Sequence, residues 1–344
     1  MPTETLDALY TKVVRKTLTE TLHVKKGESL TVEAWDNGLP FARRALVEAR
    51  AMGCRAMLVY EDERAYVEGV RRSPKDAIGI MGRNEFGMLA GTDAYIFVPG
   101  QALGSYSKTL KPEEREQSTG YNSAWYDAAK EARLRGARLA FGYVGRDLAK
   151  LLGKRIDEIV AGQLKAALVD YGEVARAAKR ISAPLADGAL AKLSSGKNEL
   201  KFTLKGELEV QDGVVDEEDR RTGNNVAYVP PGIVNKEIDP GSANGRVTLA
   251  DTLTKYGVIS YAELEFRKGT LVGWSSDDDR LERLLGSVPS EKRRLTLLGI
   301  GLNPALGYGY GQDRFVKGAV TLAGFGLTCV VQKGRLSVGS ANLP

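Results

Sequence analysis

Short apolar runs alternate with amphipathic segments along the first half of the chain. The runs predict β-strands over residues 28–34, 55–62, 94–100 and 137–144. Between them, apolar positions recur at helical spacing and predict helices over 39–53, 64–72 and 123–136. In the last of these, Ser123 is the expected N-cap and Gly136 the expected stop. Strands separated by helices of this length are typical of a parallel α/β sheet.

A longer helical pattern covers residues 146–181, and the pattern changes after Gly196. Residues 198–206 alternate as a strand does, and turn signals at Asp212-Gly213, Lys268-Gly269 and Lys333-Gly334 predict hairpins. One helix is expected at 279–285. The chain therefore predicts an α/β domain over 1–190 and an antiparallel β-rich domain over 191–344, with the boundary near 185–197.

Composition narrows the possible partners. The 344 residues carry a net charge of +5, and the basic pairs are scattered without the aromatic residues that stack nucleic-acid bases. No apolar run approaches the roughly 20 residues that span a bilayer, and the first residues show no secretory pattern. We expect a cytoplasmic protein with no specific nucleic-acid partner and no membrane partner.

The chain is poor in histidine and cysteine. His23 is its one histidine, and Cys54 and Cys329 are its two cysteines. Zinc, copper and non-haem iron sites depend on imidazole or thiolate ligands, and a hydrolytic triad ordinarily needs a histidine base. His23 follows an amphipathic segment, so we expect it to be a solvated residue at a helix end. This chain could therefore build such metal sites or a hydrolytic triad only with fewer His and Cys residues than they usually contain.

Two other patterns are candidates for phosphate or cation binding, but neither matches a known motif. The glycine-rich stretch 299–313 lacks the GK[ST] of a phosphate-binding loop, so we expect an irregular structural loop. The acidic clusters 216–219 and 277–279 lack EF-hand spacing, and solvated loop charge is the simpler interpretation.

Three segments occur in an informative order: PPGIVNKEI at 230–238, LLGIGLNP at 297–304 and DRFVKGAVTLA at 313–323. With the βαβ-like segment 42–63, they resemble the aminopeptidase T family of metal-dependent leucyl aminopeptidases. The resemblance implies an aminopeptidase T-like fold. It also implies a homodimer that encloses an internal chamber, so the expected partner is a second copy of the chain.

The family binds two divalent metals through Glu and His residues inside these motifs. The resemblance places those ligands on Ile233, Leu297 and Thr321, while Asp313 is kept and is followed by Arg314. Isoleucine and leucine offer no lone pair to a cation. We therefore expect no metal and no other cofactor. The candidate pocket comprises the following residues: Ile233, Glu237, Leu297, Asp313 and Thr321.

The alternative is a relocated metal site built from Glu237, Asp239 and Asp313. The simpler interpretation of these acidic residues is that they are solvated side chains in turns. Three functional hypotheses remain open. The first is a protein that has lost dinuclear-metal peptidase activity and acts in assembly or in binding a peptide or small molecule.

The second hypothesis is an active aminopeptidase, or another hydrolase or oxygenase, with a rearranged site. Asp313 and Lys317, with Tyr308 or Tyr310, are its candidate acids and bases. The third is a structural subunit of a homo-oligomer that associates through an exposed edge, with 329–339 as the candidate hairpin.

Overall fold

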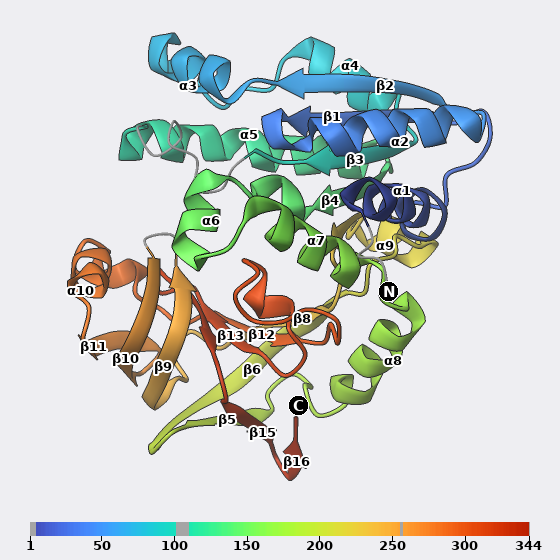
Figure 1. The fold of residues 1–344 in the computed structure, drawn as a ribbon. Coiled ribbons are helices and arrows are strands. Elements are labelled where there is room, and N and C mark those ends of the chain that lie inside the picture. The colour runs from blue at the N-terminus through green and yellow to red at the C-terminus, as the bar shows by residue number, and fades with distance from the viewer. Residues whose placement is uncertain (1–4, 101–109, 255–256, 344) are drawn as a thin grey trace. The chain divides into compact units, whose positions relative to one another are not determined.

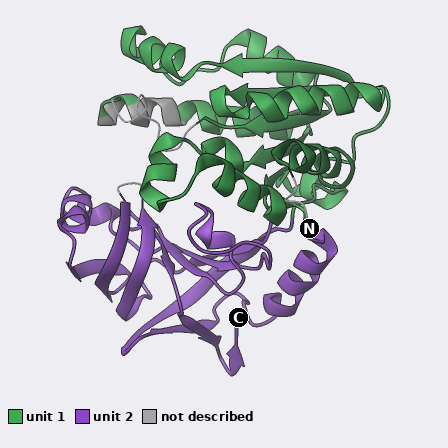
Figure 2. Ribbon diagram, in the orientation of Figure 1, with its two compact units in different colours: residues 1–168, 213–230 green, residues 169–212, 231–344 purple. Residues whose placement is uncertain are grey.

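The computed structural model describes residues 5–100, 110–254 and 257–343, with residues 112–113 and 115–119 described by their backbone alone. The chain divides into two compact units (Figure 2). Unit 1 comprises Met1–Leu168 and Gly213–Pro230, and unit 2 comprises Val169–Asp212 and Pro231–Pro344. Residues 185–197, where the sequence places a domain boundary, lie within unit 2.

Unit 1 is built on a five-stranded parallel sheet of order β2-β1-β3-β4-β7 (Figure 1). Its strands are β1 Ser29–Trp35, β2 Arg55–Glu61, β3 Ala94–Val98, β4 Arg135–Leu139 and β7 Val226–Val229. The first three lie where the apolar runs predict them. The fourth was expected over 137–144, whereas β4 begins at Arg135 and ends at Leu139, and Ala140–Tyr143 is a 3₁₀ helix. The fifth comes from the segment that returns from unit 2 and pairs in parallel with β4.

The helices of unit 1 are α1 Leu6–Lys16, α2 Leu39–Ala51, α3 Glu63–Arg72, α4 Arg83–Ala90, α5 Pro112–Glu131, α6 Arg146–Leu152, α7 Ile156–Ala167 and α9 Glu217–Thr222. One face of the sheet carries apolar side chains into the core, with Val32, Ala34 and Ile96 fully buried. On the other face, Tyr95 packs against Ala128 and Ala129 of α5.

Two helix predictions are corrected. The helix expected from Ser123 begins at Pro112, because a proline in the first turn costs no hydrogen bond. It ends at Glu131, and Gly136 lies inside β4. The single pattern over 146–181 is three helices. Gly153 ends α6 in the left-handed conformation with φ 62°, and Asp170 caps the start of α8 Tyr171–Ser182 through the amide of Gly172 at 2.8 Å.

Unit 2 is an antiparallel β unit with the strand order β11-β10-β9-β6-β8-β12-β13-β14. These strands are β6 Asn198–Gln211, β8 Ile233–Ile238, β9 Asn244–Thr254, β10 Gly257–Arg267, β11 Thr270–Ser276, β12 Leu297–Gly301, β13 Val320–Ala323 and β14 Thr328–Val331. Three further strands, β5 Leu190–Ser195, β15 Arg335–Val338 and β16 Ala341–Asn342, attach outside this path. The parallel α/β and antiparallel β-rich parts confirm the predicted fold class.

The turn signals in unit 2 had mixed outcomes. Lys268-Gly269 joins β10 and β11 as a hairpin, and the predicted helix is α10 Asp279–Gly286. Lys333-Gly334 does not form a hairpin, because β14 pairs with β13 while β15 pairs with β5 and β16. Asp212-Gly213 also forms none, since β6 ends at Gln211 and the chain passes to unit 1. In the described part of the chain, no helix is both long and apolar enough to cross a bilayer.

Candidate functional site

Three neighbouring strands of unit 2 bring the distant sequence motifs together. Leu297 of β12 lies opposite Glu237 of β8, and Gly299 lies opposite both Asn235 of β8 and Thr321 of β13. Ile233 pairs with Gly301 at the end of the same ladder. Side chains alternate between the faces of a strand, so Ile233, Glu237, Leu297 and Thr321 project from one face. The opposite face carries Val234, Leu298 and Leu322 into the unit 2 core.

The side chains on this face converge over Gly299. A Cβ at that glycine would lie 3.1 Å from the Cβ of Thr321, 3.2 Å from Oδ1 of Asn235 and 3.2 Å from Cδ1 of Ile233. An apolar branch, an amide and a hydroxyl therefore surround one glycine of the strand. The sequence reasoning missed Asn235, although the strand alternation from Ile233 to Glu237 was the signal that places it there.

The site is closed at one end and open at the other. Ile233 and Thr321 are each 3% exposed, and the Thr321 hydroxyl has no hydrogen-bond partner among the described residues. Asn235 donates from Nδ2 to Glu209 at 3.1 Å. Leu297 is half-buried, and Glu237 is exposed. The face thus runs from an unsatisfied buried hydroxyl to a solvated carboxylate.

Asp313 is not on these strands; it belongs to the 3₁₀ helix Asp313–Phe315 in the loop after β12. Its carboxylate accepts the amide of Gly309 at 2.9 Å. Burial raises the pKa of Asp313, and the backbone amides of Gly309 and Tyr310 partly oppose that rise. Within the described residues, Asp313 makes no hydrogen bond or ion pair with any of the other four side chains of the predicted pocket.

The acid–base candidates around Asp313 differ in their exposure. Burial, followed by the negative charge of Asp313, raises the pKa of Tyr308, whose side chain is still 38% exposed. Lys317 is exposed and holds the loop through its backbone amide, which donates to Asn303 at 3.0 Å. Of these candidates, Tyr308 is the one whose pKa the charge of Asp313 raises, and no hydrogen bond or ion pair joins Lys317 to Asp313.

The donor set does not fit a pair of divalent metals. Ile233 and Leu297 present only hydrocarbon, and Thr321 presents one hydroxyl. Among the side chains that the structure describes, no three of His, Cys, Asp or Glu are grouped closely enough to hold a metal ion. Glu237 and Asp239 are exposed at the end of β8, whereas Asp313 is buried in its loop.

A solved structure described as wild-type AmpT from Thermus thermophilus matches this chain with a TM-score of 0.66, covering 97% of this chain and 96% of that chain. The fold is aminopeptidase T-like. Sequence identity is 14%, so the likeness concerns the fold alone. No protein-family profile and no curated protein sequence matches the chain. On this aminopeptidase T-like fold, the face around Gly299 is a candidate site assembled from three strands.

Proposed function

We propose that this chain is an aminopeptidase T-like protein that has lost dinuclear-metal peptidase activity and acts by binding a peptide or small molecule. One observation supports the loss most directly. Ile233, Leu297 and Thr321 occupy one face of a peptidase-type fold, with two hydrocarbon side chains and one hydroxyl where a dinuclear site needs carboxylates and imidazoles. Metal charge buried among such groups would cost several kcal/mol per ion.

The same face offers what a peptide-like ligand needs. Ile233 and Leu297 supply apolar contact, Asn235 supplies an amide, and Thr321 supplies a buried hydroxyl that lacks a partner among the described residues. A buried polar group without a partner is costly, and a ligand amide that satisfies it would remove that cost. A peptide segment from a second copy of the chain could bind to this face in the same way, and this would be one route to self-assembly. The proposed setting is a cytoplasmic homodimer.

A second candidate function rests on Asp313 and Tyr308. Both groups have raised pKa values, and burial is the main cause in each. A buried carboxyl and a phenol with raised pKa values can exchange protons with a substrate, so a metal-independent hydrolase is the competing proposal. The predicted edge hairpin at 329–339 does not form, so the third hypothesis loses its structural basis there.

Metal analysis and activity assays together test the main proposal. Protein purified without chelator should contain far less than one transition metal per chain. A panel of aminoacyl arylamides should show no turnover above background, with or without added zinc or cobalt. Stoichiometric metal, or turnover that depends on metal, would contradict the proposal.

Variants separate the two candidate functions. Metal-independent turnover that disappears in Asp313→Asn and persists in Glu291→Gln, an exposed carboxylate used as control, would favour the hydrolase. The homodimer is tested by light scattering at two protein concentrations, where a monomer at both would argue against self-association.

A further inference from the structure

The strand β2 forms one edge of the unit 1 sheet, and in the described part of the chain no strand pairs with its outer side (Figure 1). It pairs with β1 over all seven residues from Arg55 to Glu61 without a bulge. The strand contains neither proline nor lysine, two residues with which proteins commonly protect an open edge. The other edge strand, β7, has four residues and is followed directly by Pro230. β2 is therefore the long, regular edge of this sheet.

Alternate residues of β2 present unpaired backbone groups at this edge. The amide of Arg55 donates to the carbonyl of Glu28 at 2.8 Å, so the backbone of Arg55 faces β1. Successive residues of a strand face opposite sides, so the amides and carbonyls of Ala56, Leu58 and Tyr60 face outward. Accordingly, the carbonyl of Ala56 accepts the side chain of Arg50 at 3.1 Å. These outward groups are the row to which another strand adds when it extends a sheet.

Large apolar side chains are exposed along the same edge. The exposed fractions are 44% for Met57, 36% for Leu58 and 46% for Tyr60. Neighbouring side chains of a strand lie on opposite faces, so Met57 widens the apolar surface on one face of the sheet and Leu58 on the other. Val47 of α2, a helix that packs against β2, is also exposed. An open edge with an apolar surface on both sides is typical of a site that another chain covers.

Opposite charges lie at the two ends of β2. Arg55 begins the strand, is exposed and forms no ion pair with a described residue. Glu61 ends the strand and likewise has no ion pair among the described residues. Asp62 follows as the N-cap of α3. Burial, followed by the negative charges of Glu33 and Asp62, raises the pKa of Glu61. One end of the strand therefore carries an unpaired cation, and the other carries carboxylates without a counter-charge.

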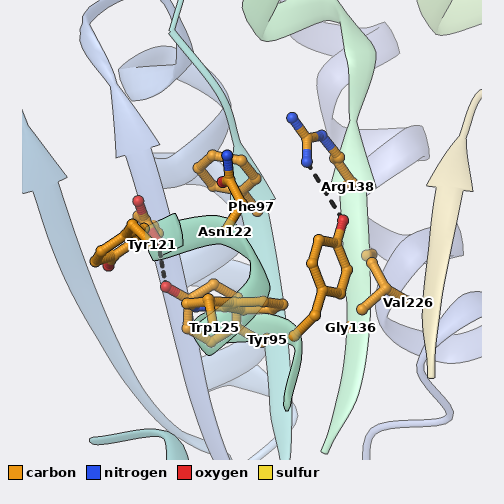
Figure 3. A pocket seen from close by; sticks show the side chains of 11 residues that line it. Tyr95, Phe97, Tyr121, Asn122, Trp125, Gly136, Arg138 and Val226 are labelled. Atoms are coloured by element: carbon orange, nitrogen blue, oxygen red, sulfur yellow. Dashed lines mark hydrogen bonds between the residues drawn. The ribbon is translucent and has the colours of Figure 1, made fainter. Parts of the chain in front are cut away.

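The arginines on the other described strands of this sheet are engaged elsewhere. Arg135 of β4 pairs with Glu28 at 2.7 Å. Arg138 of β4 donates to the hydroxyl of Tyr126 at 3.4 Å and lies 5.2 Å from the centre of the Phe97 ring, within the aromatic cluster between the sheet and α5 (Figure 3). The acidic end of β2 thus remains available to a cation from another molecule.

We propose that two copies of this chain associate by antiparallel pairing of their β2 strands about a twofold axis at Leu58. This is the one antiparallel register that pairs all seven residues of the strand. It sets Arg55 opposite the partner's Glu61 and Ala56 opposite the partner's Tyr60. Residues directly opposite each other share a face, so the charged side chains meet and the small alanine leaves room for the tyrosine. The twofold axis repeats each contact.

The same register satisfies the outward backbone groups. The two copies of Leu58 exchange a pair of hydrogen bonds, and so do Ala56 and the partner's Tyr60. The carbonyl of Ala56 then accepts this tyrosine's amide in place of the Arg50 side chain. A single strand pair is smaller than the roughly 800 Å² per partner of a standard interface, so Val47 and Met57 must contribute to it. This inference rests on the homodimer proposed above, and it leaves the Gly299 face free for a ligand.

Light scattering and amide hydrogen exchange test this surface on the full, unmodified chain. We expect a dimer that dissociates on dilution. The amides of Ala56, Leu58 and Tyr60 should exchange at least about tenfold more slowly in the dimer than in the monomer. A monomer up to roughly 100 μM would overturn both this inference and the homodimer. A dimer in which these three amides exchange as they do in the monomer would overturn the β2 surface alone.

Charge variants test whether Arg55 meets the partner's Glu61. Arg55→Glu and Glu61→Arg should each raise the dimer dissociation constant about tenfold or more, because like charges then oppose each other. An equimolar mixture of the two variants should restore association, since every contact then joins unlike charges. Within one strand the two residues are about 20 Å apart, so rescue by mixing requires contact between copies. A mixture that associates no better than either variant alone would contradict this register.

Two further variants complete the test. Leu58→Pro removes an outward amide at an edge position where proline is tolerated, so it should abolish the dimer and leave the circular dichroism spectrum unchanged. Arg335→Glu is the control for charge reversal, because Arg335 is an exposed strand arginine of unit 2, and its association should match that of the unmodified chain. Dimerisation of Leu58→Pro at unmodified strength would contradict the proposal. If a variant fails to fold, amide exchange in the unmodified chain still decides the question.

Discussion

The Cβ that Gly232 lacks would lie 2.7 Å from the backbone nitrogen of Asn303. The two residues belong to the PPG and LNP segments that carry the family resemblance. Asn303 is 0% exposed, its Nδ2 donates to the carbonyl of Pro231 at 2.9 Å, and the amide of Leu302 donates to Gly232 at 2.8 Å. The residues of these two motifs therefore hold each other in place. This structural role explains their presence without a catalytic role.

Replacing Gly232 by alanine should be strongly destabilising. Gly232 has φ +108°, a conformation that residues with a Cβ disfavour. The added Cβ would also clash with the backbone of Asn303, which cannot move away as a flexible side chain could. We expect Gly232→Ala to lower the free energy of unfolding by about 3 kcal/mol or more, measured by urea denaturation. Gly241→Ala is the control, since its nearest atom would be a side-chain oxygen at 3.8 Å, and it should change stability by less than about 1 kcal/mol. Equal effects would contradict the packing argument.

Local pattern predicts much of unit 1 because its strands and helices differ in period. The runs that became β1, β2 and β3 are apolar, and α2 shows an apolar stripe that ends close to Gly53. The strand β7 was missed because it has four residues and its partner β4 lies about ninety positions earlier. No local signal encodes that pairing.

Turn chemistry predicts a reversal of the chain without naming the strand partners. Lys333 has φ 59° and the chain does turn there, yet the strands on either side pair elsewhere. The candidate site has the same difficulty. Ile233, Leu297 and Thr321 share a face only because of the register between β8, β12 and β13, and the family resemblance, not periodicity, led to them.

The buried hydroxyl of Thr321 predicts a stabilising substitution. It has no partner among the described residues, so an isosteric apolar group should fit better. We expect Thr321→Val to raise the free energy of unfolding by about 1 kcal/mol. Thr252→Val is the matched control: Thr252 is 1% exposed, but its hydroxyl donates to Val330 at 2.8 Å. That variant should lose about 1 kcal/mol, and a loss in both would show that the Thr321 hydroxyl is satisfied in solution.

Introducing metal-binding side chains on the face around Gly299 should create a metal-dependent protein. The triple variant Ile233→Glu, Leu297→Glu, Thr321→His places two carboxylates and an imidazole on the face around Gly299. Without metal it should be several kcal/mol less stable, because Ile233 and Thr321 are buried. Added zinc should raise its melting temperature by linkage and leave the unmodified chain unchanged. A zinc-induced rise in the unmodified chain would contradict the proposed loss of metal binding.

Asp313 should make stability depend on pH. Burial raises its pKa in the folded state, so the folded chain binds this proton more tightly than the unfolded chain does. The contribution is fully present below the unfolded pKa of about 4 and is lost as pH rises through the folded pKa. In Asp313→Asn the new amide cannot titrate, yet its oxygen can still accept the amide of Gly309. This variant should therefore gain stability relative to the unmodified chain as pH rises.

Asp278 serves as the control, because its pKa is shifted in the opposite direction and its effect on stability should therefore change with pH in the opposite sense. Its hydrogen bonds with the Arg280 side chain, and with the backbone amide of that residue, lower its pKa to about 2. Its contribution is present above the unfolded pKa and is lost as pH falls through the folded value. Unfolding curves for Asp313→Asn and Asp278→Asn between about pH 3 and pH 8 should thus diverge from the unmodified chain in opposite directions. A constant difference for Asp313→Asn across this range would show that its carboxyl is not buried in solution, and the hydrolase alternative built on Asp313 and Tyr308 would lose its acid.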